Sequence, residues 1–255
     1  QEAGKSCVQV FFYRSKQNWG NQSYFPSHDK FHTAEEVLAS FVAQFYENKN
    51  VPTEILLNIK IKDLNLIKAA LEKKEEKLIS IKIPIKGNAL KLSKMAEKNA
   101  KEALTRKIFE SETNTRLLNQ IADKFKLNTS PRTIEVYDNS HIQGAYSVGA
   151  LITFGSEGFL KKQYRKFNIK NNRIKPGDDY GMLKEVFHRR FSKIVKLKNQ
   201  NDIMAPDLVI IDGGKGQYSV GRKILDEYGL HDIPIIAIAK GKNRGKSDEN
   251  FIYQS

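Results

Sequence analysis

Cysteine is almost absent from this sequence of 255 residues, which contains only Cys7. A single thiol excludes a disulfide framework and any cysteine-rich zinc or iron–sulfur site within the chain. No base or histidine stands beside Cys7 in the sequence, so we interpret it as an inert buried thiol. This cysteine usage fits a cytoplasmic protein.

Long apolar runs are also missing. No stretch of about 18 apolar residues occurs, so no membrane-spanning helix and no membrane partner are expected. No charged segment followed by an apolar one stands at the start, so no secretory leader is expected. The first residue is Gln1, which suggests a piece of a longer protein, and the length allows one large domain or two ordinary ones.

Acidic residues are fewer than basic ones: the sequence has 29 Asp and Glu and 43 Lys and Arg, which gives a net charge of +14. The excess is concentrated between Lys161 and Lys198, where 13 basic residues and three acids give a local net charge of +10. Such a balance favours a polyanionic partner, since basic side chains neutralise phosphates and release counterions. A solvated, solubilising surface explains the same charge, so composition alone does not decide between the two.

The first part of the sequence predicts alternating strands and helices, which is typical of an α/β layer. Thr33 and Glu36 have the spacing of a capping box at a helix start, and Asp63 is expected to cap the next helix. The segment around Gly20 is expected to be a loop. The predicted strands are residues 8–14, 23–26, 53–61 and 78–85, and the predicted helices are 32–49 and 63–76.

The second part predicts another α/β arrangement, after a long helical segment between residues 88 and 125. Short glycine-bearing connections predict an antiparallel meander of three strands, and two later strands are apolar throughout, which indicates burial on both faces. We therefore expect a smaller module (1–87), a helical connector (88–130) and a second domain (131–255). The predicted elements of this domain are strands 133–138, 146–154 and 163–169, helix 176–195, strand 207–212, helix 216–230 and strand 233–241.

Two of these predicted strands end in an aspartate, Asp138 and Asp212, and Gly213 and Gly214 follow the second. If the strands lie side by side, the carboxylates converge and repel unless a cation lies between them or one is protonated. Mg²⁺ and Mn²⁺ prefer carboxylate oxygens, and such a site can position water for displacement at phosphorus. The glycines leave space for a phosphate. The alternative is that each aspartate only caps a turn.

Other polar residues are weaker candidates. Asp178 and Asp179 stand at a predicted helix start, where an N-cap and a third metal-binding acid are both open interpretations. His141 and His188 are interpreted as hydrogen-bonded structural residues rather than ligands. The segment after Asp212 lacks the spacing of a phosphate-binding loop of nucleotide hydrolases, so an ATPase is not favoured.

Five ordered motifs together resemble the C-terminal endonuclease domain of the UvrC family of excinucleases: YDNSHIQG, YRKFNIK, PGDDYGM, PDLVIIDGGKGQ and AIAKGKNR. Two upstream segments, VQVFFYRSKQNWGNQSYFP and VPTEILL, resemble the central region of the same family. The resemblance implies an RNase H-like mixed sheet flanked by helices. It implies for the first part a smaller α/β module, a degenerate and metal-free RNase H-like platform.

The resemblance also implies a function. It implies a Mg²⁺- or Mn²⁺-dependent endonuclease of nucleotide excision repair that nicks damaged double-stranded DNA on the 5′ side of a lesion, together with UvrB. By motif, Asp138 and Asp212 match the catalytic, metal-binding aspartates, and the GDDY motif supplies a further acid, Asp178 or Asp179. Tyr164, Arg165, Lys215 and Lys240 are our candidates for contacts to the DNA backbone.

The sequence departs from the family pattern in one important respect. The family completes its aspartate pair with a histidine on a later helix, whereas this sequence stops at FIYQS and none of its five histidines matches. Because the expected catalytic histidine lies beyond residue 255, we expect the chain alone to be impaired in cleavage. The segment that docks UvrB is also missing. The rival interpretations are a non-catalytic DNA-binding or assembly module with structural aspartates, and a junction-resolving or transposase-type nuclease.

Overall fold

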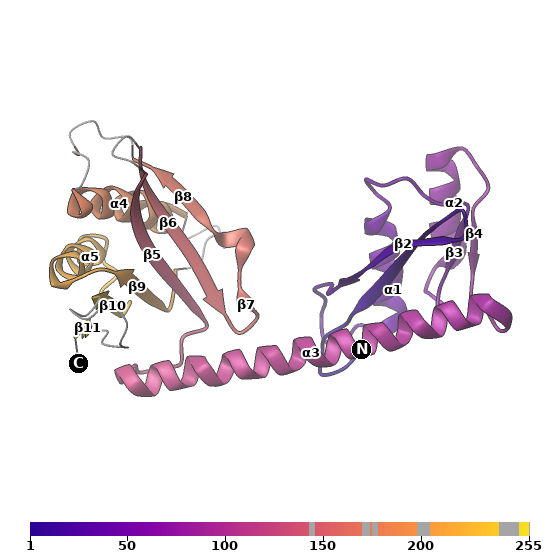
Figure 1. The fold of residues 1–255 in the computed structure, drawn as a ribbon, viewed down its shortest axis with the longest axis horizontal. Helices are drawn as coiled ribbons and strands as arrows, with labels where there is room; N and C mark the ends of the chain where they lie inside the picture. The colour runs from indigo at the N-terminus through magenta and orange to yellow at the C-terminus, as the bar shows by residue number, and fades with distance from the viewer. Residues whose placement is uncertain (143–145, 170–173, 175–177, 198–204, 240–249, 255) are drawn as a thin grey trace. The chain divides into compact units, whose positions relative to one another are not determined.

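The chain forms two compact units, Gln1–Phe109 and Glu110–Ser255, in the computed structural model shown in Figure 1. The structure describes all residues except 143–145, 170–173, 175–177, 198–204, 240–249 and 255, and it leaves out the side chains of residues 139–142, 146 and 147. Helix α3 (Gly87–Phe125) is one uninterrupted helix of 39 residues and contributes residues to both units.

The first unit contains two small sheets, the antiparallel pair β1–β2 and the parallel pair β3–β4. Its core lies between α1, α2 and the parallel pair, and it includes Leu38, Val42, Ile55, Leu71 and Ile79. The elements before α3 are β1 (Val8–Arg14), β2 (Gln17–Tyr24), α1 (Ala34–Phe45), β3 (Glu54–Leu56), α2 (Leu64–Glu75) and β4 (Ser80–Lys82).

The segment around Gly20 belongs to a strand, so the predicted loop is wrong. Ser15 and Lys16 both have positive φ, 49° and 63°, and form a tight turn that starts β2 at Gln17. Turns of this kind match the twist of the two strands that they join. The glycine and asparagines of β2 concealed the strand, because these residues are rare in strands.

The two predicted helix caps of this unit have different outcomes. The capping box is confirmed, because the Thr33 hydroxyl accepts the Glu36 N–H and the Glu36 carboxylate accepts the Thr33 N–H. The predicted Asp63 cap is wrong: Asp63 precedes α2, but it is in the left-handed region (φ 54°) and its side chain makes no capping hydrogen bond.

The second unit is built on a seven-stranded mixed sheet with the strand order β11-β10-β9-β5-β6-β7, and β8 pairs with β6. Strands β5, β9 and β10 are parallel, and the other pairs are antiparallel, including the predicted meander β5–β6–β8. The elements are β5 (Thr133–Ile142), β6 (Tyr146–Gly155), β7 (Gly158–Phe159), β8 (Arg165–Asn168), α4 (Asp179–Leu197), β9 (Leu208–Asp212), α5 (Lys215–Glu227), β10 (Ile235–Ala239) and β11 (Asn250–Tyr253).

Each face of this sheet is covered by helices. One core joins α4 and α5 to side chains such as Tyr137 and Ile211, and a second core joins the end of α3 to Ile134 and Leu208 (Figure 1). Because successive side chains of a strand point to opposite faces, even-numbered residues of β5 and β9 face α3 and odd-numbered ones face α4 and α5. The fold is thus the α/β fold with a mixed, helix-flanked sheet that the sequence predicts.

Strand β5 does not stop at Asp138, so this part of the prediction is wrong. Its antiparallel ladder with β6 continues to Ile142, which pairs with Tyr146. The parallel ladder with β9, in contrast, ends at the pair Tyr137 and Ile211. Asp138 therefore lies within β5, at the position where β5 ceases to pair with β9.

Candidate functional site

Asp138 and Asp212 lie on neighbouring strands at the same edge of the parallel ladder. Each immediately follows a member of the last β5–β9 pair, Tyr137 and Ile211, where adjacent strands run about 4.8 Å apart. Because successive side chains of a strand alternate between the two faces, both aspartates lie on the face of the sheet that carries Ile134 and Leu208. Asp138 is exposed and Asp212 is half-buried, so solvent and ligands can reach the pair.

A turn cap does not account for Asp138, because the backbone remains in an extended strand there and pairs with Ala150 of β6. Within the described part of the chain its carboxylate accepts no hydrogen bond. Asp212 is also held in register, since it pairs with Ile238 of β10 and the next N–H, of Gly213, donates to the Ile238 carbonyl (3.0 Å). Neighbouring strands therefore fix the backbone of both aspartates.

The glycines after Asp212 have separate roles. Gly213 lies against the Gln217 side chain, and a Cβ at this position would lie 2.1 Å from Gln217 Oε1. Gly214 precedes α5, and its N–H donates to Gln217 Oε1 (2.7 Å). A Cβ at Gly214 would meet nothing within 4 Å, so the predicted open space is present at Gly214 and is filled at Gly213.

The two acids at the start of α4 are distinguished by their contacts. Asp178 is the N-cap, because its Oδ1 accepts the N–H of Gly181 (2.9 Å) and its carbonyl accepts the N–H of Met182 (3.0 Å). A Cβ at residue 181 would lie 2.5 Å from the Asp178 carboxylate, so the glycine permits this cap. Asp179 is the first residue of the helix and is half-buried.

Three of the candidate DNA-contacting residues lie in the described part of the chain, and Lys240 lies outside it. Arg165 pairs with Leu151 and so faces α4, and its Nη1 donates to the carbonyls of Lys162 (2.9 Å) and Tyr164 (2.8 Å). Tyr164 is half-buried next to it. Lys215 is exposed at the first position of α5, three residues after Asp212.

Lys166 is a basic residue that the sequence analysis overlooked. It pairs with Ala150, and Ala150 pairs with Asp138, so the three lie in one row across β8, β6 and β5. Directly paired residues share a face, which places an exposed lysine about 10 Å from Asp138, two strand spacings, on the same side of the sheet. Ala150 leaves the space between them free of a long side chain.

Of the two histidines considered in the sequence analysis, the structure describes the side chain of one, His188. His188 lies on α4 and faces α5, with Nδ1 3.1 Å from the Tyr228 hydroxyl and Nε2 3.9 Å from the Glu227 carboxylate. The side chain of His141 lies outside the described residues. Among those that are described, no group of three or more His, Cys, Asp or Glu side chains has the arrangement of a metal site.

A buried charge cluster beside the site was not predicted. Glu135, which is 3% exposed, accepts hydrogen bonds from Nε (3.1 Å) and Nη2 of Arg190 and from the Tyr137 hydroxyl (2.5 Å). Burial lowers the pKa of Arg190, but the hydrogen bond and charge of Glu135 outweigh it and raise the pKa overall. Burial, and then the charge of Glu135, raises the pKa of Tyr137 well above its usual value. The cluster ties α4 to β5, three residues before Asp138.

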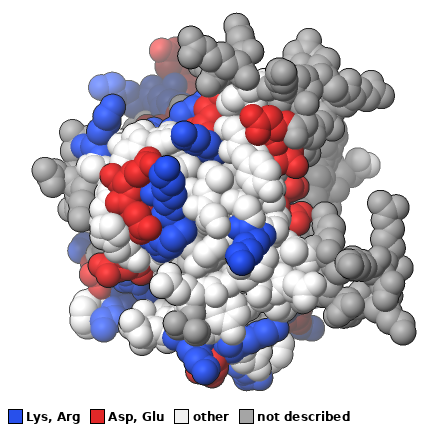
Figure 2. All heavy atoms as spheres, turned by 90° about the vertical axis from the view of Figure 1, so that its left-hand side faces the viewer, with Lys and Arg blue, Asp and Glu red and all other residues white. Residues whose placement is uncertain are grey.

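The basic tract is partly neutralised within the fold. Arg190 is bound by Glu135, and Arg189 is bound by Glu185 at 3.1 Å. Figure 2 shows basic side chains interspersed with acidic ones and with a broad uncharged area on the face that it displays. The described basic side chains on this face therefore do not form one continuous basic field.

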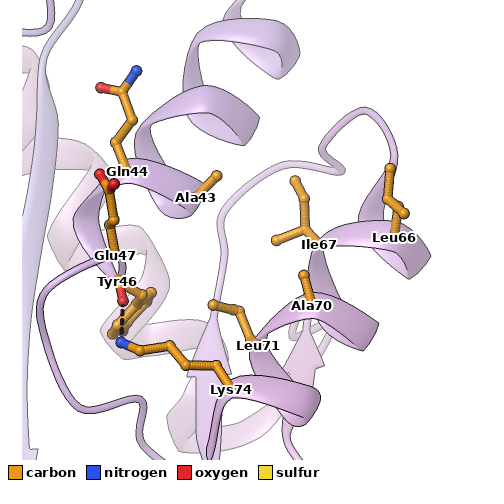
Figure 3. Close-up of a pocket in the computed structure, with 9 residues that line it drawn as sticks. All are labelled: Ala43, Gln44, Tyr46, Glu47, Leu66, Ile67, Ala70, Leu71 and Lys74. Carbon is orange, nitrogen blue, oxygen red and sulfur yellow. Dashed lines mark hydrogen bonds between the residues drawn. The ribbon is translucent and has the colours of Figure 1, made fainter.

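The first unit contains a hollow of about 420 Å³ between α1 and α2 (Figure 3). Its wall is mainly apolar and includes Leu66, Ile67 and Leu71. The Lys74 ammonium at its edge donates to the carbonyls of Tyr46 (2.5 Å) and Lys49 (2.7 Å). Glu47 is the only carboxylate among the residues that line it, so the hollow lacks the paired acids of the second unit.

Family models match both units. The model described as UvrC RNAse H endonuclease domain matches residues 122–255, and that described as UvrC Ribonuclease H-like domain matches residues 1–107. The chain belongs to the UvrC family. The family models and the sheet topology together identify the second unit as RNase H-like.

Curated members of the UvrC family are similar over nearly the whole chain. UvrABC system protein C of Ruegeria sp. (strain TM1040) is 46% identical over 251 residues, which are 98% of this chain and 40% of the relative. The protein of the same name from Bradyrhizobium diazoefficiens is 47% identical over 258 residues, 98% of this chain and 38% of the relative. The chain thus spans about two fifths of the length of these relatives.

Solved structures are more distant. Human ENDOV aligns with 52% of this chain and 63% of its own, at 10% identity and a TM-score of 0.35. A Kluyveromyces polysporus Argonaute with a guide RNA aligns with 86% of this chain and 27% of its own, at 17% identity and a TM-score of 0.31. Scores this low carry no inference about the chain. No helix in the described residues is long and apolar enough to cross a membrane.

Proposed function

We propose that this chain carries the endonuclease site of a UvrC-type excision nuclease, which hydrolyses a phosphodiester on the 5′ side of a lesion in double-stranded DNA. The observation that carries the proposal is the position of Asp138 and Asp212, which immediately follow the same last pair of a parallel ladder. The name of these relatives, UvrABC system protein C, supports excision repair as the setting and UvrB as a partner. The cytoplasmic location expected from the sequence is part of the proposal.

The residues at this edge fit a divalent cation. Two carboxylates follow neighbouring strands at the same edge of the parallel ladder, Asp138 exposed and Asp212 half-buried, so a cation there would take oxygen ligands from both. Carboxylate oxygens and water are the ligands that Mg²⁺ and Mn²⁺ prefer. Asp138 and Asp212 would hold the ion, which when bound supplies Lewis-acid stabilisation of the phosphoryl charge and an activated water.

The other residues of the site are proposed to position the substrate. Lys166, in the row of Asp138, and Lys215, at the start of α5, would contact backbone phosphates on either side of the aspartates. Arg165 lies on the opposite face of the sheet from Asp138, so a phosphate that it contacts would belong to another part of the bound DNA. Tyr164 remains a candidate contact. Phosphate contacts fix the strand but read no sequence, which suits an enzyme whose target is defined by damage.

Asp179 rather than Asp178 is proposed as the further functional acid. The Asp178 carboxylate accepts a hydrogen bond from the backbone of α4, which is the structural role of an N-cap. Asp179 lies in the first turn of the same helix, which Arg190 ties to β5. The expected division into residues 1–87, 88–130 and 131–255 is retained as part of the proposal, with the metal site confined to the last segment.

The experiment is Mn²⁺ binding to the 255-residue chain, measured by the loss of free Mn²⁺ paramagnetic resonance signal. Asp138→Asn and Asp212→Asn should each weaken binding more than about 100-fold, beyond the usual effect of losing an outer-shell partner. Asp232→Asn is the matched control, because Asp232 is exposed and precedes β10 at the opposite end of the parallel strands. Equal Mn²⁺ affinity in all three variants would refute the proposed ligands.

A non-catalytic DNA-binding or assembly module is the second candidate function, and the capping role of Asp178 is the observation that favours it. Incision by the full-length protein separates the two candidates. If Asp138→Asn and Asp212→Asn cut a lesion-bearing duplex at the normal rate, the aspartates are structural and the module only binds. Loss of cutting with normal DNA binding supports the endonuclease.

A further inference from the structure

Trp19 lies in a β-bulge of the first unit. Across the β1–β2 hairpin Phe12 pairs with Gly20 and Tyr13 pairs with Asn18, so Trp19 is the extra residue between two paired neighbours. Gly20 has a φ of +123° and its N–H donates to Asn18 Oδ1 at 2.8 Å, which stabilises the irregular backbone. A bulge of this kind re-aims a side chain away from the regular alternation of its strand.

The Trp19 side chain is 65% exposed, although indole is among the largest apolar groups. The guanidinium carbon of Arg14 lies 5.4 Å from the centre of its ring, within the range of a cation–π contact. Another aromatic residue of the hairpin is placed differently, since the Phe12 ring stacks on Phe45 of α1 at 6.4 Å. Phe12 is thus partly packed within the unit and 39% exposed, whereas no such ring packing within the described residues accounts for the greater exposure of Trp19.

The charge of the hairpin favours an anionic ligand. From Val8 to Tyr24 the sequence contains two basic residues, Arg14 and Lys16, and no carboxylate. Both basic residues are exposed at the same end of the hairpin as Trp19. An exposed aromatic plane beside cationic side chains is the arrangement on which proteins stack the bases of single-stranded nucleic acids.

We propose that the tip of the β1–β2 hairpin binds single-stranded DNA by stacking an unpaired base on Trp19, with Arg14 and Lys16 contacting the adjacent phosphates. A base within an intact duplex is already stacked on its neighbours and cannot offer its face, so the site selects unpaired nucleotides. Stacking tolerates every base, because each has a π-face. The inference goes beyond the proposed endonuclease and does not depend on the metal ligands, which lie in the other unit.

Trp19 itself provides the readout, because it is the only tryptophan of the chain. Titration of the 255-residue chain with oligo(dT) in a metal-free buffer should quench its fluorescence saturably, and a fully paired duplex should leave most of it unchanged. The dissociation constant from quenching should agree with that from the polarisation of a labelled oligo(dT). Agreement places the bound strand on this residue.

Variants test the stacking contact by fluorescence polarisation. Trp19→Ala should weaken oligo(dT) binding about 5- to 100-fold, and Trp19→Phe should lose less, because a smaller ring can still stack. Phe31→Ala is the matched control: Phe31 is 81% exposed, with the Lys30 ammonium 5.1 Å from its ring, and it lies outside the hairpin. This control should bind within about twofold of the parent chain.

Three results would overturn the proposal. The first is unchanged oligo(dT) affinity of Trp19→Ala. The second is an equal loss of affinity for single-stranded and duplex DNA, which indicates a general electrostatic effect. The third is a change in sedimentation of Trp19→Ala without a change in DNA binding, which indicates that Trp19 belongs to a protein interface. Loss of Mn²⁺ binding in the Asp138 variant would leave all these measurements unaffected.

Discussion

Both units contain a pair of parallel strands, and both match RNase H-like family models, but they differ in the residues that follow the last pair. In the second unit Asp138 and Asp212 follow. In the first unit Leu57 and Ile83 follow the last pair of β3 and β4, and Leu57 is buried. Parallel strands alone therefore do not make the proposed cation site, because only the second unit has carboxylates directly after such a pair in the described residues.

The units also differ in where they place ion pairs. Glu135 is almost fully buried near the candidate site and Arg190 is mostly buried, since their side chains are 4% and 16% exposed. Glu54 and Lys82 join the parallel strands of the first unit at 2.7 Å, but both side chains are more than half exposed. Water screens the exposed pair of Glu54 and Lys82, but it cannot replace a lost partner in the pair of Glu135 and Arg190. The two pairs should therefore respond very differently to substitution.

The largest effect is expected from Glu135→Gln. It leaves the Arg190 guanidinium buried without its counter-charge and should destabilise the second unit by about 3–5 kcal/mol. Denaturant unfolding followed by hydrogen exchange of β5 amides measures this loss. The double variant Glu135→Leu with Arg190→Met, which removes both charges, should recover most of the stability. A double variant as unstable as the single one would contradict the assignment of the loss to an unpaired charge.

The next effect concerns catalysis rather than stability. Asp138→Asn in the full-length protein should lower the rate of incision more than about 100-fold, while the free energy of unfolding changes by no more than about 0.5 kcal/mol, because the side chain is exposed. Glu54→Gln in the first unit is the comparison, since that carboxylate lies in a parallel pair without a second acid. Normal incision by the Asp138 variant would remove the distinction between the units.

A smaller effect is expected at one helix cap in each unit. Thr33→Ala and Asp178→Ala each remove the side-chain acceptor at the start of a helix and should cost about 1 kcal/mol of stability. Thermal unfolding measures both. Incision should survive in Asp178→Ala and fall in Asp179→Asn. The reverse result would exchange the roles that we propose for the two acids.

The smallest effect is expected from Lys82→Ala. It breaks the exposed ion pair with Glu54 and should change the stability of the first unit by less than about 1 kcal/mol. Adding salt should reduce the effect further, because exposed charges are screened. Destabilisation as large as that of Glu135→Gln would show that exposure does not distinguish the two ion pairs.

The sequence was sufficient to predict those features that depend on local patterns of residues. Helical spacing predicted α3, the Thr33 and Glu36 spacing predicted the capping box, and continuous apolar residues predicted the buried strand β9. The two apolar strands that each carry an aspartate near one end could also be recognised, whereas their pairing side by side was only a condition of the argument. These signals are local, so they require no knowledge of neighbouring elements.

Features that depend on distant partners could not be predicted. Strand β5 continues past Asp138 because β6 pairs with it, and residues 133–138 alone do not determine that pairing. Glu135 resembles an ordinary polar residue of an alternating strand until Arg190, 55 positions later, is placed opposite it. The bulge at Trp19 depends on how two strands align after a tight turn. In each case a long-range contact outweighs the local preference.

The unequal pairing of β5 has a consequence for how this edge behaves over time. Up to Tyr137 the strand is held from both sides, and from Asp138 to Ile142 β6 alone holds it within the described residues, so the sheet forks at the aspartates. Amide protons before the fork should exchange slowly with solvent and those beyond it faster. In the metal site that we propose, Asp138 would then have the more adaptable backbone of the two aspartates, while the core on both faces of the sheet stays in place.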